Sequence, residues 1–375
     1  MEGGCGMNDV AVYVSRLIES AIEGGASDIH LEPEQEGFLV RFREDGFLRE
    51  VERKGEVWGP PVVSKIKLMS GMDIGERRLP QDGGFTFESH NKAIDIRVAT
   101  LPTIYGEKVV LRLLPHHVHF TSLSSLGMEK SHEKTVKKLL IQSQGMILIS
   151  GPTGSGKTTT MYAMLHELKK DGRNVISLEQ PVEYRVPGVN QVQIHPRSGL
   201  SFHEGLRAVL RQDPDVILVG EIRDRQTAEV AVRAALTGHL IISTIHTIDA
   251  VGTVIRLLDM GIEPYLVSSS LTGVVAQRLV RKVCDFCYGH YSGCEKCQGS
   301  GLHGRIGIFE VLALDEEFHP FILNRCSADV MRKHLQSREE FTSLFKTLQR
   351  KVAEGVAEPE AFERYAVLQS KDALV

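Results

Sequence analysis

The sequence lacks the features that mark membrane-spanning, exported and repetitive chains. It contains no apolar run of the roughly 18–20 residues that a membrane-spanning helix needs. It does not begin with a charged stretch, an apolar core and a small-residue cleavage site, so we expect no secretory leader. Internal repeats and low-complexity segments are also absent. We therefore expect a cytoplasmic protein that reaches a membrane only through its partners.

The sequence also has few aromatic residues and no excess of one charge. Aromatic residues make up 6%, with a single tryptophan, and 44 basic residues face 48 acidic ones for a net charge of −4. Proteins that bind nucleic acid commonly show a basic surface with interleaved aromatic rings, and no such run is present. We expect no direct contact with nucleic acid. Hydrophobic residues (42%) suffice for a packed core, and 375 residues suffice for two or three domains.

Cysteine is scarce, and most of it is clustered. Of six cysteines, Cys5 and Cys326 stand alone. The other four form two C-x-x-C pairs six residues apart: Cys284, Cys287, Cys294 and Cys297. Four thiolates in two tight turns suit a tetrahedral Zn²⁺ with no open position, which predicts a structural zinc site. Redox chemistry is the alternative, and the many glycines around the cysteines favour a loop tied by metal.

One octet is the most specific motif of the chain. Residues 151–158 fit the phosphate-binding pattern G-x-x-x-x-G-K-[ST]. The apolar run at 146–149 predicts a buried strand before it, and 159–168 predicts a helix after it. Backbone amides and the helix N-terminus would bind the phosphates of ATP. We expect Lys157 to reach the β- and γ-phosphates and Thr158 to bind Mg²⁺. The predicted nucleotide contacts are Gly151, Pro152, Thr153, Gly154, Ser155, Gly156, Lys157, Thr158 and Thr159.

The patterning predicts two domains joined by a linker at 116–125. Residues 8–115 read as a small α+β domain. Its expected helices are 10–23 and 61–72, and its expected strands are 38–42, 47–51, 84–88, 93–100 and 109–114. Glu44, Asp45 and Gly46 predict a hairpin turn between the first two strands.

Residues 126–375 alternate helices with buried strands, which predicts an α/β domain with a mostly parallel sheet. Its expected strands are 146–150, 174–178, 216–219 and 240–244, and its expected helices are 158–170, 202–212, 225–237 and 250–259. A helical tail is expected at 315–370.

Acidic and histidine side chains follow the predicted strands. Glu221 ends the strand at 216–219, where an acid could hold Mg²⁺ through water. Glu179 and Glu183 follow the strand at 174–178, and one of them could orient the attacking water. His239 and His246 frame the strand at 240–244 and are candidates to sense phosphate. The alternative for each histidine is an ordinary core or surface residue.

The chain resembles the ATPases that drive type II secretion, type IV pilus assembly and competence pseudopili. The resemblance runs from about residue 10 to 365 and rests on motifs in a fixed order, at 26–33, 97–103, 106–112, 151–158, 179–183, 205–215, 220–224, 239–246 and 284–297. It implies that Glu183 is the catalytic base at the end of an "Asp box", in which Gln180 replaces a frequent acid. It further implies that Glu221 belongs to an atypical Walker B motif, and that His239 and His246 form a "His box".

The resemblance also assigns two arginine pairs. Arg97 and Arg112 match arginines of the N-terminal domain that reach a nucleotide held by the same or a neighbouring subunit. Arg207 and Arg211 match a second pair on a predicted helix. A planar guanidinium stabilises the charge that grows on the γ-phosphate. Without the resemblance, each arginine would read as a surface cation.

The resemblance finally implies an architecture and partners. It implies a RecA-like core, a PAS-like N-terminal α+β domain and a helical C-terminal region with a zinc knuckle. The expected assembly is a homo-hexamer at the inner face of the cell membrane, powered by ATP with Mg²⁺, that acts on a polytopic platform protein with a cytoplasmic adaptor. The resemblance starts at the second N-terminal domain of longer members, which implies either a short member, as the competence-type ATPases are, or a truncated form of a longer one. The cysteine loop favours assembly over retraction ATPases. A P-loop switch or a nucleic-acid translocase with a RecA core is the alternative.

Overall fold

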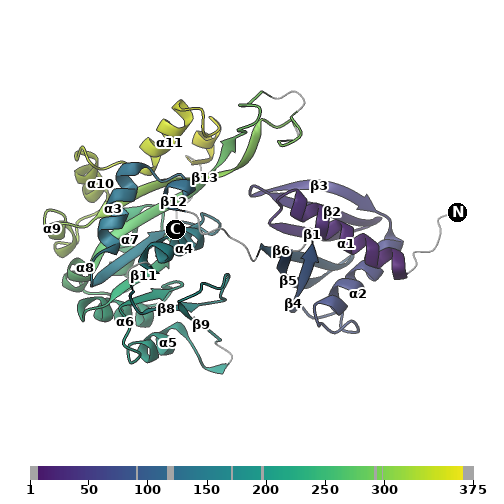
Figure 1. The fold of residues 1–375 in the computed structure, drawn as a ribbon, viewed down its shortest axis with the longest axis horizontal. Coiled ribbons are helices and arrows are strands. Elements are labelled where there is room, and N and C mark those ends of the chain that lie inside the picture. The colour runs from purple at the N-terminus through teal and green to yellow at the C-terminus, as the bar shows by residue number, and fades with distance from the viewer. Residues whose placement is uncertain are drawn as a thin grey trace. The chain divides into compact units, whose positions relative to one another are not determined.

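The chain forms two units, each with its own sheet and core. The computed structural model describes residues 7–89, 92–115, 122–169, 172–195, 198–290, 294–297 and 299–365. The units span residues 1–118 and 119–375, and Figure 1 shows both. Cys5 and residues 116–121 of the predicted linker lie outside the described residues, and the linker's other residues lead into a short 3₁₀ helix, Ser124–Leu126.

The first unit is an antiparallel sheet with two helices on one face. Its strands have the order β3-β2-β1-β6-β5-β4, and apolar residues of α1 and α2 pack on the inward-facing residues of the strands. The strand β1 was not among the predicted strands, although Ile29 and Leu31 alternate with polar residues. The elements are α1 (Met7–Glu23), β1 (Asp28–Glu34), β2 (Gly37–Glu44), β3 (Phe47–Lys54), α2 (Gly59–Met69), β4 (Gln81–Ser89), β5 (Lys92–Thr103) and β6 (Gly106–Pro115).

The second unit confirms the predicted α/β class. Its sheet has the order β13-β12-β7-β11-β10-β8-β9. All neighbours are parallel except β12 and β13. Strands β7, β8, β10 and β11 occur where the apolar runs predict them. The strands are β7 (Gly145–Ser150), β8 (Val175–Glu179), β9 (Asn190–Gln193), β10 (Val216–Val219), β11 (Leu240–Ile245), β12 (Leu271–Val283) and β13 (Leu302–Ala313).

Helices cover both faces of this sheet, and the two apolar cores lie between them and the strands. α3 and α4 pack on one face, and α5 to α8 with the helical tail pack on the other. The helices are α3 (Lys130–Leu140), α4 (Lys157–Leu168), α5 (Phe202–Val209), α6 (Arg225–Leu236), α7 (Ala250–Asp259), α8 (Pro264–Ser270), α9 (His319–Leu323), α10 (Ala328–Gln336) and α11 (Leu344–Ala353).

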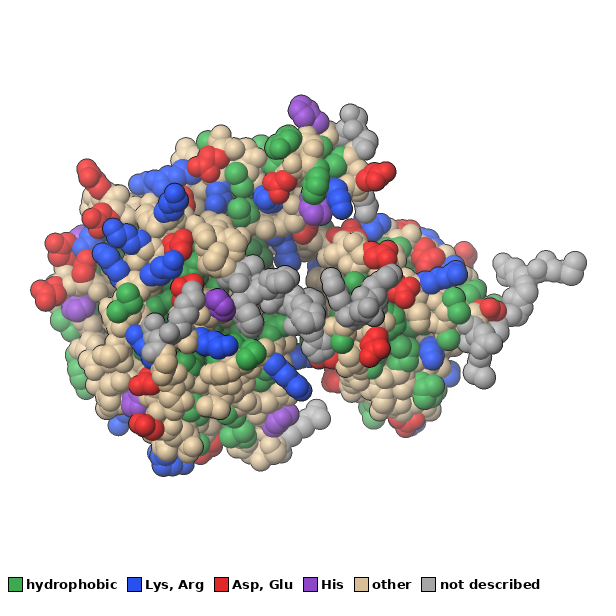
Figure 2. Space-filling model, viewed as in Figure 1, with side chains coloured by type: hydrophobic (Ala, Val, Ile, Leu, Met, Phe, Trp, Pro, Cys, Tyr) green, Lys and Arg blue, Asp and Glu red, His purple; other side chains and the backbone are tan. Residues whose placement is uncertain are grey.

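The long hairpin of β12 and β13 is the main feature that the sequence did not predict. It adds two strands to the sheet beside β7, and the four clustered cysteines lie between its strands, ahead of the helical tail. The predicted tail consists of α9, α10 and α11, and residues 366–370 of it lie outside the described residues. None of the helices described is both long and apolar enough to cross a membrane. On the face drawn in Figure 2, acidic and basic side chains are interspersed over each unit.

Candidate functional site

Four of the predicted motifs lie at one edge of the second sheet. Ser150 at the end of β7 pairs with Ile245 at the end of β11. Val219 at the end of β10 pairs with Ser243 of β11 and Leu178 of β8. Because parallel strands all end at the same edge, the loops that follow them lie together. This edge therefore carries the phosphate loop, Glu221, His246 and the segment that contains Glu183.

Two glycines of the phosphate loop, Gly151 and Gly156, occupy positions where a side chain would meet close neighbours. Gly151 and Gly156 have φ angles of 152° and 86°. A Cβ on Gly151 would collide with the Ser155 hydroxyl and the Gln277 carbonyl, and one on Gly156 would lie 2.8 Å from Gln277 Nε2. The loop thus packs against β12, and Thr160 on α4 also donates a 2.6 Å hydrogen bond to Gln277 Oε1. Strand β12 therefore holds the loop in shape.

Lys157 lies inside the loop and is partly desolvated. Its ammonium group donates hydrogen bonds to the carbonyls of Gly151 (2.8 Å) and Pro152 (2.9 Å). Burial lowers the pKa of Lys157 to about 8, Glu221 opposes this shift, and Arg278 adds to it. The other predicted loop contacts share this segment: Ser155 is buried, Pro152 and Thr158 are half-buried, and Thr153, Gly154 and Thr159 are exposed.

Glu221 and His246 meet beside the loop. His246 Nε2 lies 3.8 Å from Glu221 Oε2, and Arg223 Nε lies 2.7 Å from the same oxygen. Burial lowers the pKa of His246, as do the charges of Lys157 and Arg223, while Glu221 raises it. His246 is therefore a neutral imidazole at neutral pH. Arg223 was not predicted as a site residue, although it stands in the same motif as Glu221.

The two glutamates after β8 have different surroundings. Glu179 is buried and accepts hydrogen bonds from Ser177 (2.6 Å), Gln191 (3.0 Å) and Tyr162. Its oxygens accept hydrogen bonds from three donors inside the protein, which favours a structural role for Glu179 over the site role that the sequence predicts. Glu183 is exposed at the loop edge.

The structure corrects the prediction for His239. His239 precedes β11, next to Leu240, which pairs with Gly145 at the start of β7. The phosphate loop follows the other end of the same strands. The six paired residues place His239 roughly 20 Å from the loop at about 3.3 Å per residue. The His239 ring instead lies 3.1 Å from the Ala234 carbonyl, so it does not reach a nucleotide bound by its own chain.

The arginine pair of the second unit, Arg207 and Arg211, does not lie at this edge. Arg207 and Arg211 line a groove of about 680 Å³ between α5 and α6, together with Arg233. Asn174, just before β8, donates to the carbonyls of Gln212 and Asp213, which places Arg211 near the opposite edge of the sheet.

The second arginine pair lies in the first unit. Arg97 on β5 pairs directly with Arg112 on β6, and both point away from the core. Arg112 Nε donates a 2.9 Å hydrogen bond to Asp28. Asp28 also lies 3.8 Å from Arg43.

The four clustered cysteines form a site of the right size for Zn²⁺. Their Sγ atoms all lie within 4.8 Å of one another. Cys284 and Cys294 are 3.9 Å apart, and Cys287 and Cys297 are 3.6 Å apart. A tetrahedral ion with Zn–S bonds of ~2.3 Å separates its ligands by about 3.8 Å. All four thiols are free of disulfide bonds, so the donor set fits zinc. The isolated Cys326 is likewise free.

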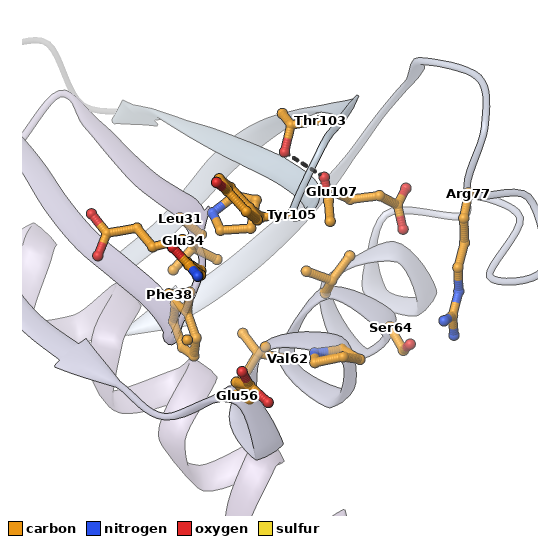
Figure 3. A pocket seen from close by; sticks show the side chains of 17 residues that line it. Leu31, Glu34, Phe38, Glu56, Val62, Ser64, Arg77, Thr103, Tyr105 and Glu107 are labelled. Carbon is orange, nitrogen blue, oxygen red and sulfur yellow. Dashed lines mark hydrogen bonds between the residues drawn. The ribbon is translucent and has the colours of Figure 1, made fainter.

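The first unit has a hollow that contains none of the predicted site residues. It measures about 450 Å³ and lies between the start of α2 and the turns that join β1 to β2 and β5 to β6. Figure 3 shows Phe38 and Val62 on its apolar floor and Glu34, Glu56 and Arg77 at its rim.

Sequence reasoning missed Gln277, which packs against the phosphate loop, and its neighbour Arg278, which donates to the Ile248 carbonyl. Arg278 is only 6% exposed and Gln277 only 2%. The available signal was a pair of polar residues in the otherwise apolar run 273–280. Polar groups buried in a strand require partners, so they mark a place where the strand meets something polar.

Comparison with known proteins identifies a family model and relatives that agree with one another. The model of the family "Type II/IV secretion system protein" matches residues 6–364. The chain is 44% identical over 347 residues to the type II secretion system ATPase E of Vibrio cholerae, covering 86% of this chain and 69% of the relative. It is 42% identical over 374 residues to a putative type II secretion system protein E of Escherichia coli, covering 92% and 76%.

Solved structures agree on the fold. The pilus retraction motor PilT with bound ADP is 27% identical, with a TM-score of 0.68 over 92% of this chain and 94% of PilT. The ATPase DotB of Legionella pneumophila has a TM-score of 0.74 over 96% of both chains. At 22% identity, the likeness to DotB concerns the fold alone.

Proposed function

Because the chain belongs to the type II/IV secretion system protein family and is an ATPase of that family, we propose that it hydrolyses ATP at the 151–158 loop. The energy would drive assembly of a pseudopilus or pilus. The main support for this proposal is that Lys157, Glu221 and His246 lie together at one edge of the sheet. The names of the relatives favour secretion over a nucleic-acid translocase.

The arrangement suggests a role for each residue. Lys157 would exchange its two carbonyl partners for phosphate oxygens. Thr158 and, through water, Glu221 would hold Mg²⁺, which neutralises phosphate charge. Glu183 is exposed at the same edge and would orient the attacking water. The neutral ring of His246 would contact the γ-phosphate region beside Glu221.

The positions of the two arginine pairs favour an enzyme that works as an assembly of several subunits. We propose a homo-hexamer in which Arg97 and Arg112 reach a nucleotide when the units close over it. Arg207 and Arg211 lie away from the loop of their own chain, so they would act at a boundary with a neighbouring subunit. Such a ring would work at the inner face of the membrane against a platform protein, with a cytoplasmic adaptor. The four clustered cysteines would bind one Zn²⁺.

The test is ATP hydrolysis by the purified chain and by Lys157→Ala. Removal of the loop's cation should abolish turnover and weaken binding of a fluorescent ATP analogue. Lys138→Ala, which removes an exposed lysine of α3, is the matched control and should hydrolyse ATP normally. Normal turnover by a folded Lys157→Ala protein would refute the assignment.

A further inference from the structure

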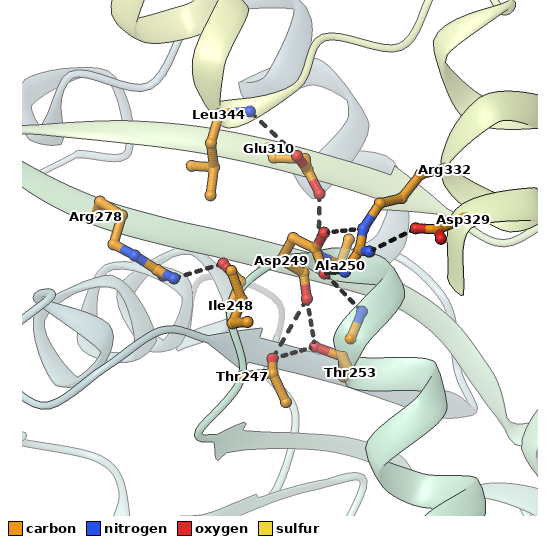
Figure 4. A network of polar contacts seen from close by, with 11 residues as sticks. Thr247, Ile248, Asp249, Ala250, Thr253, Arg278, Glu310, Asp329, Arg332 and Leu344 are labelled. Carbon is orange, nitrogen blue, oxygen red and sulfur yellow. Dashed lines mark hydrogen bonds and ion pairs between the residues drawn. The ribbon is translucent and has the colours of Figure 1, made fainter. Parts of the chain in front are cut away.

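The segment that joins β11 to α7 carries His246 and is held from several sides. It consists of residues 246–249, between the end of β11 and the first residue of α7. Figure 4 shows that side chains from β12, β13 and α10 converge on this segment and on the first turn of α7. We call residues 246–249 the bridge. Its first residue lies 3.8 Å from Glu221, and its last residue contacts the helical tail.

Strand β12 holds the middle of the bridge. Arg278 donates a 2.5 Å hydrogen bond to the Ile248 carbonyl and a 2.9 Å bond to the Gln277 carbonyl. Gln277 in turn bonds Thr160 on α4, the helix that begins with Lys157. The bridge is thus tied to the strand that supports the phosphate loop. The buried guanidinium of Arg278 fixes the backbone at Ile248, because a buried charge without hydrogen-bond partners would strongly destabilise the fold.

The helical tail holds the end of the bridge. Asp249 caps α7 by accepting a 2.7 Å bond from the Gly252 amide. The same carboxylate binds Arg332 of α10, with Nε and Oδ2 2.7 Å apart. Thr247 and Thr253 both donate to the Asp249 carbonyl. The orientation of the bridge therefore depends on where α10 lies.

A buried glutamate, Glu310, links the start of α7 to a second helix of the tail, α11. Glu310 on β13 accepts a 2.9 Å bond from the Ala250 amide at the start of α7 and a 3.1 Å bond from the Leu344 amide at the start of α11. Burial raises the pKa of Glu310 to about 7, as does the charge of Asp249, while Arg332 lowers it. One carboxyl group thus fixes two helix N-termini to each other.

We infer that the bridge lets the helical tail position His246, so that Arg332 and Glu310 control hydrolysis although neither lies at the phosphate loop. Both are positioning residues that act through the backbone of residues 246–250. The inference rests on the proposed ATPase function and deepens it. Its physical basis is that displacing a group by about 1 Å can cost a hundredfold in rate.

The test compares two arginines of the tail. Arg332→Gln removes the contact with the bridge. The control Arg338→Gln removes ion pairs with Asp315 and Glu317, at 2.6 and 2.8 Å, that do not touch the bridge. We expect Arg332→Gln to lower kcat roughly ten- to a hundredfold. The KM for ATP should stay within about twofold because the phosphate loop is intact. Arg332→Lys should recover part of the loss, and Arg338→Gln should hydrolyse ATP normally.

A double-mutant cycle separates positioning from mere stability. In a His246→Ala background, Arg332→Gln should cause no further loss of kcat, because the group it positions is gone. Losses that multiply, or an unchanged kcat in Arg332→Gln, would overturn the inference.

Hydrogen–deuterium exchange gives a readout that needs no turnover. Arg332→Gln should speed exchange in residues 246–253 and leave the first unit unchanged. If the wild-type chain hydrolyses no ATP, the proposed function fails, while exchange still reports on the bridge. Unchanged exchange in that segment would refute the bridge itself.

Discussion

The carboxylate of Glu179 accepts a hydrogen bond from the phenol of Tyr162, and this contact joins β8 to the helix that follows the phosphate loop. Burial raises the pKa of Tyr162, as does the charge of Glu179. The phenol therefore stays protonated and donates. Glu179 belongs to the scaffold that places α4. This role separates it from Glu183, whereas the position of the two glutamates after a predicted strand did not distinguish them.

The two glutamates should respond differently to the same substitution. Glu183→Gln should keep ATP binding and thermal stability while kcat falls by ~10²–10⁴, the usual contribution of a general base. Glu179→Gln places an amide where three donors point, so it should lower the free energy of unfolding by about 1–3 kcal/mol. Thermal unfolding and single-turnover ATPase assays measure both. A stable Glu179→Gln with no turnover, beside an active Glu183→Gln, would reverse the roles.

Nucleotide affinity should depend on pH through Lys157. Burial lowers the pKa of Lys157 to about 8, and bound phosphate oxygens should raise it again, so binding takes up a proton above that pH. ADP affinity should be flat below pH 8 and should fall by about tenfold per pH unit above it. Calorimetric titration across this range is the measurement. Lys157→Arg keeps its charge throughout and should show no such fall; the same fall in this variant would assign the effect to another group.

Removal of zinc should loosen one loop without disturbing the nucleotide site. The purified chain should contain one Zn²⁺, and chelation or Cys284→Ser should increase protease sensitivity within residues 280–305. Nucleotide binding should persist. Cys326→Ser, which removes the isolated thiol, is the matched control and should retain the metal. Metal analysis that detects no zinc in freshly reduced protein would favour the redox alternative.

Hydrolysis should require groups from more than one chain. Arg97→Ala should leave nucleotide binding intact but lower kcat, by less than the ~10³–10⁵ of a single arginine finger because several arginines share the charge. Mixing inactive Lys157→Ala chains with impaired Arg97→Ala chains should raise activity above that of the separate variants if the arginine acts across a subunit boundary. Specific activity should also rise with protein concentration. No recovery, in rings shown to mix, would confine Arg97 to its own subunit.

The free energy of unfolding of the second unit should depend on pH through the ionisation of Glu310. Its pKa is about 7 in the folded chain against an ordinary value of 4.5, because burial and Asp249 outweigh Arg332 and the two amides. The folded protein therefore binds this proton more tightly than the unfolded chain. The stabilisation is complete below the ordinary pKa and is lost as pH rises through about 7, amounting to about 3 kcal/mol.

Urea unfolding at several pH values measures this titration, and Glu310→Gln is the comparison. The variant cannot ionise at this position, so its stability should vary less between the two pKa values than that of the wild type. Parallel pH profiles for the two proteins would show that Glu310 is ionised throughout.

The sequence pattern predicted those elements that depend on residues next to one another in the chain. The apolar runs at 146–149 and 216–219 predicted two strands, and the Asp45–Gly46 turn is a two-residue hairpin signal. Strand β12 escaped prediction because buried polar residues interrupt its apolar run. Its pairing with β7 joins residues more than a hundred positions apart, and no local period reports such a contact.

The sequence by itself determined the phosphate loop, the α/β class and the cysteine set, because each depends on residues close together in the chain. Only the tertiary structure decided which of those residues share a site. Parallel pairing brought Glu221 and His246 together and placed His239 at the opposite edge of the sheet. It likewise buried Glu179 among three donors and connected Asp249 to Arg332, 83 positions away. Such distances in space follow from strand order and register, which long-range packing selects and local patterning does not encode.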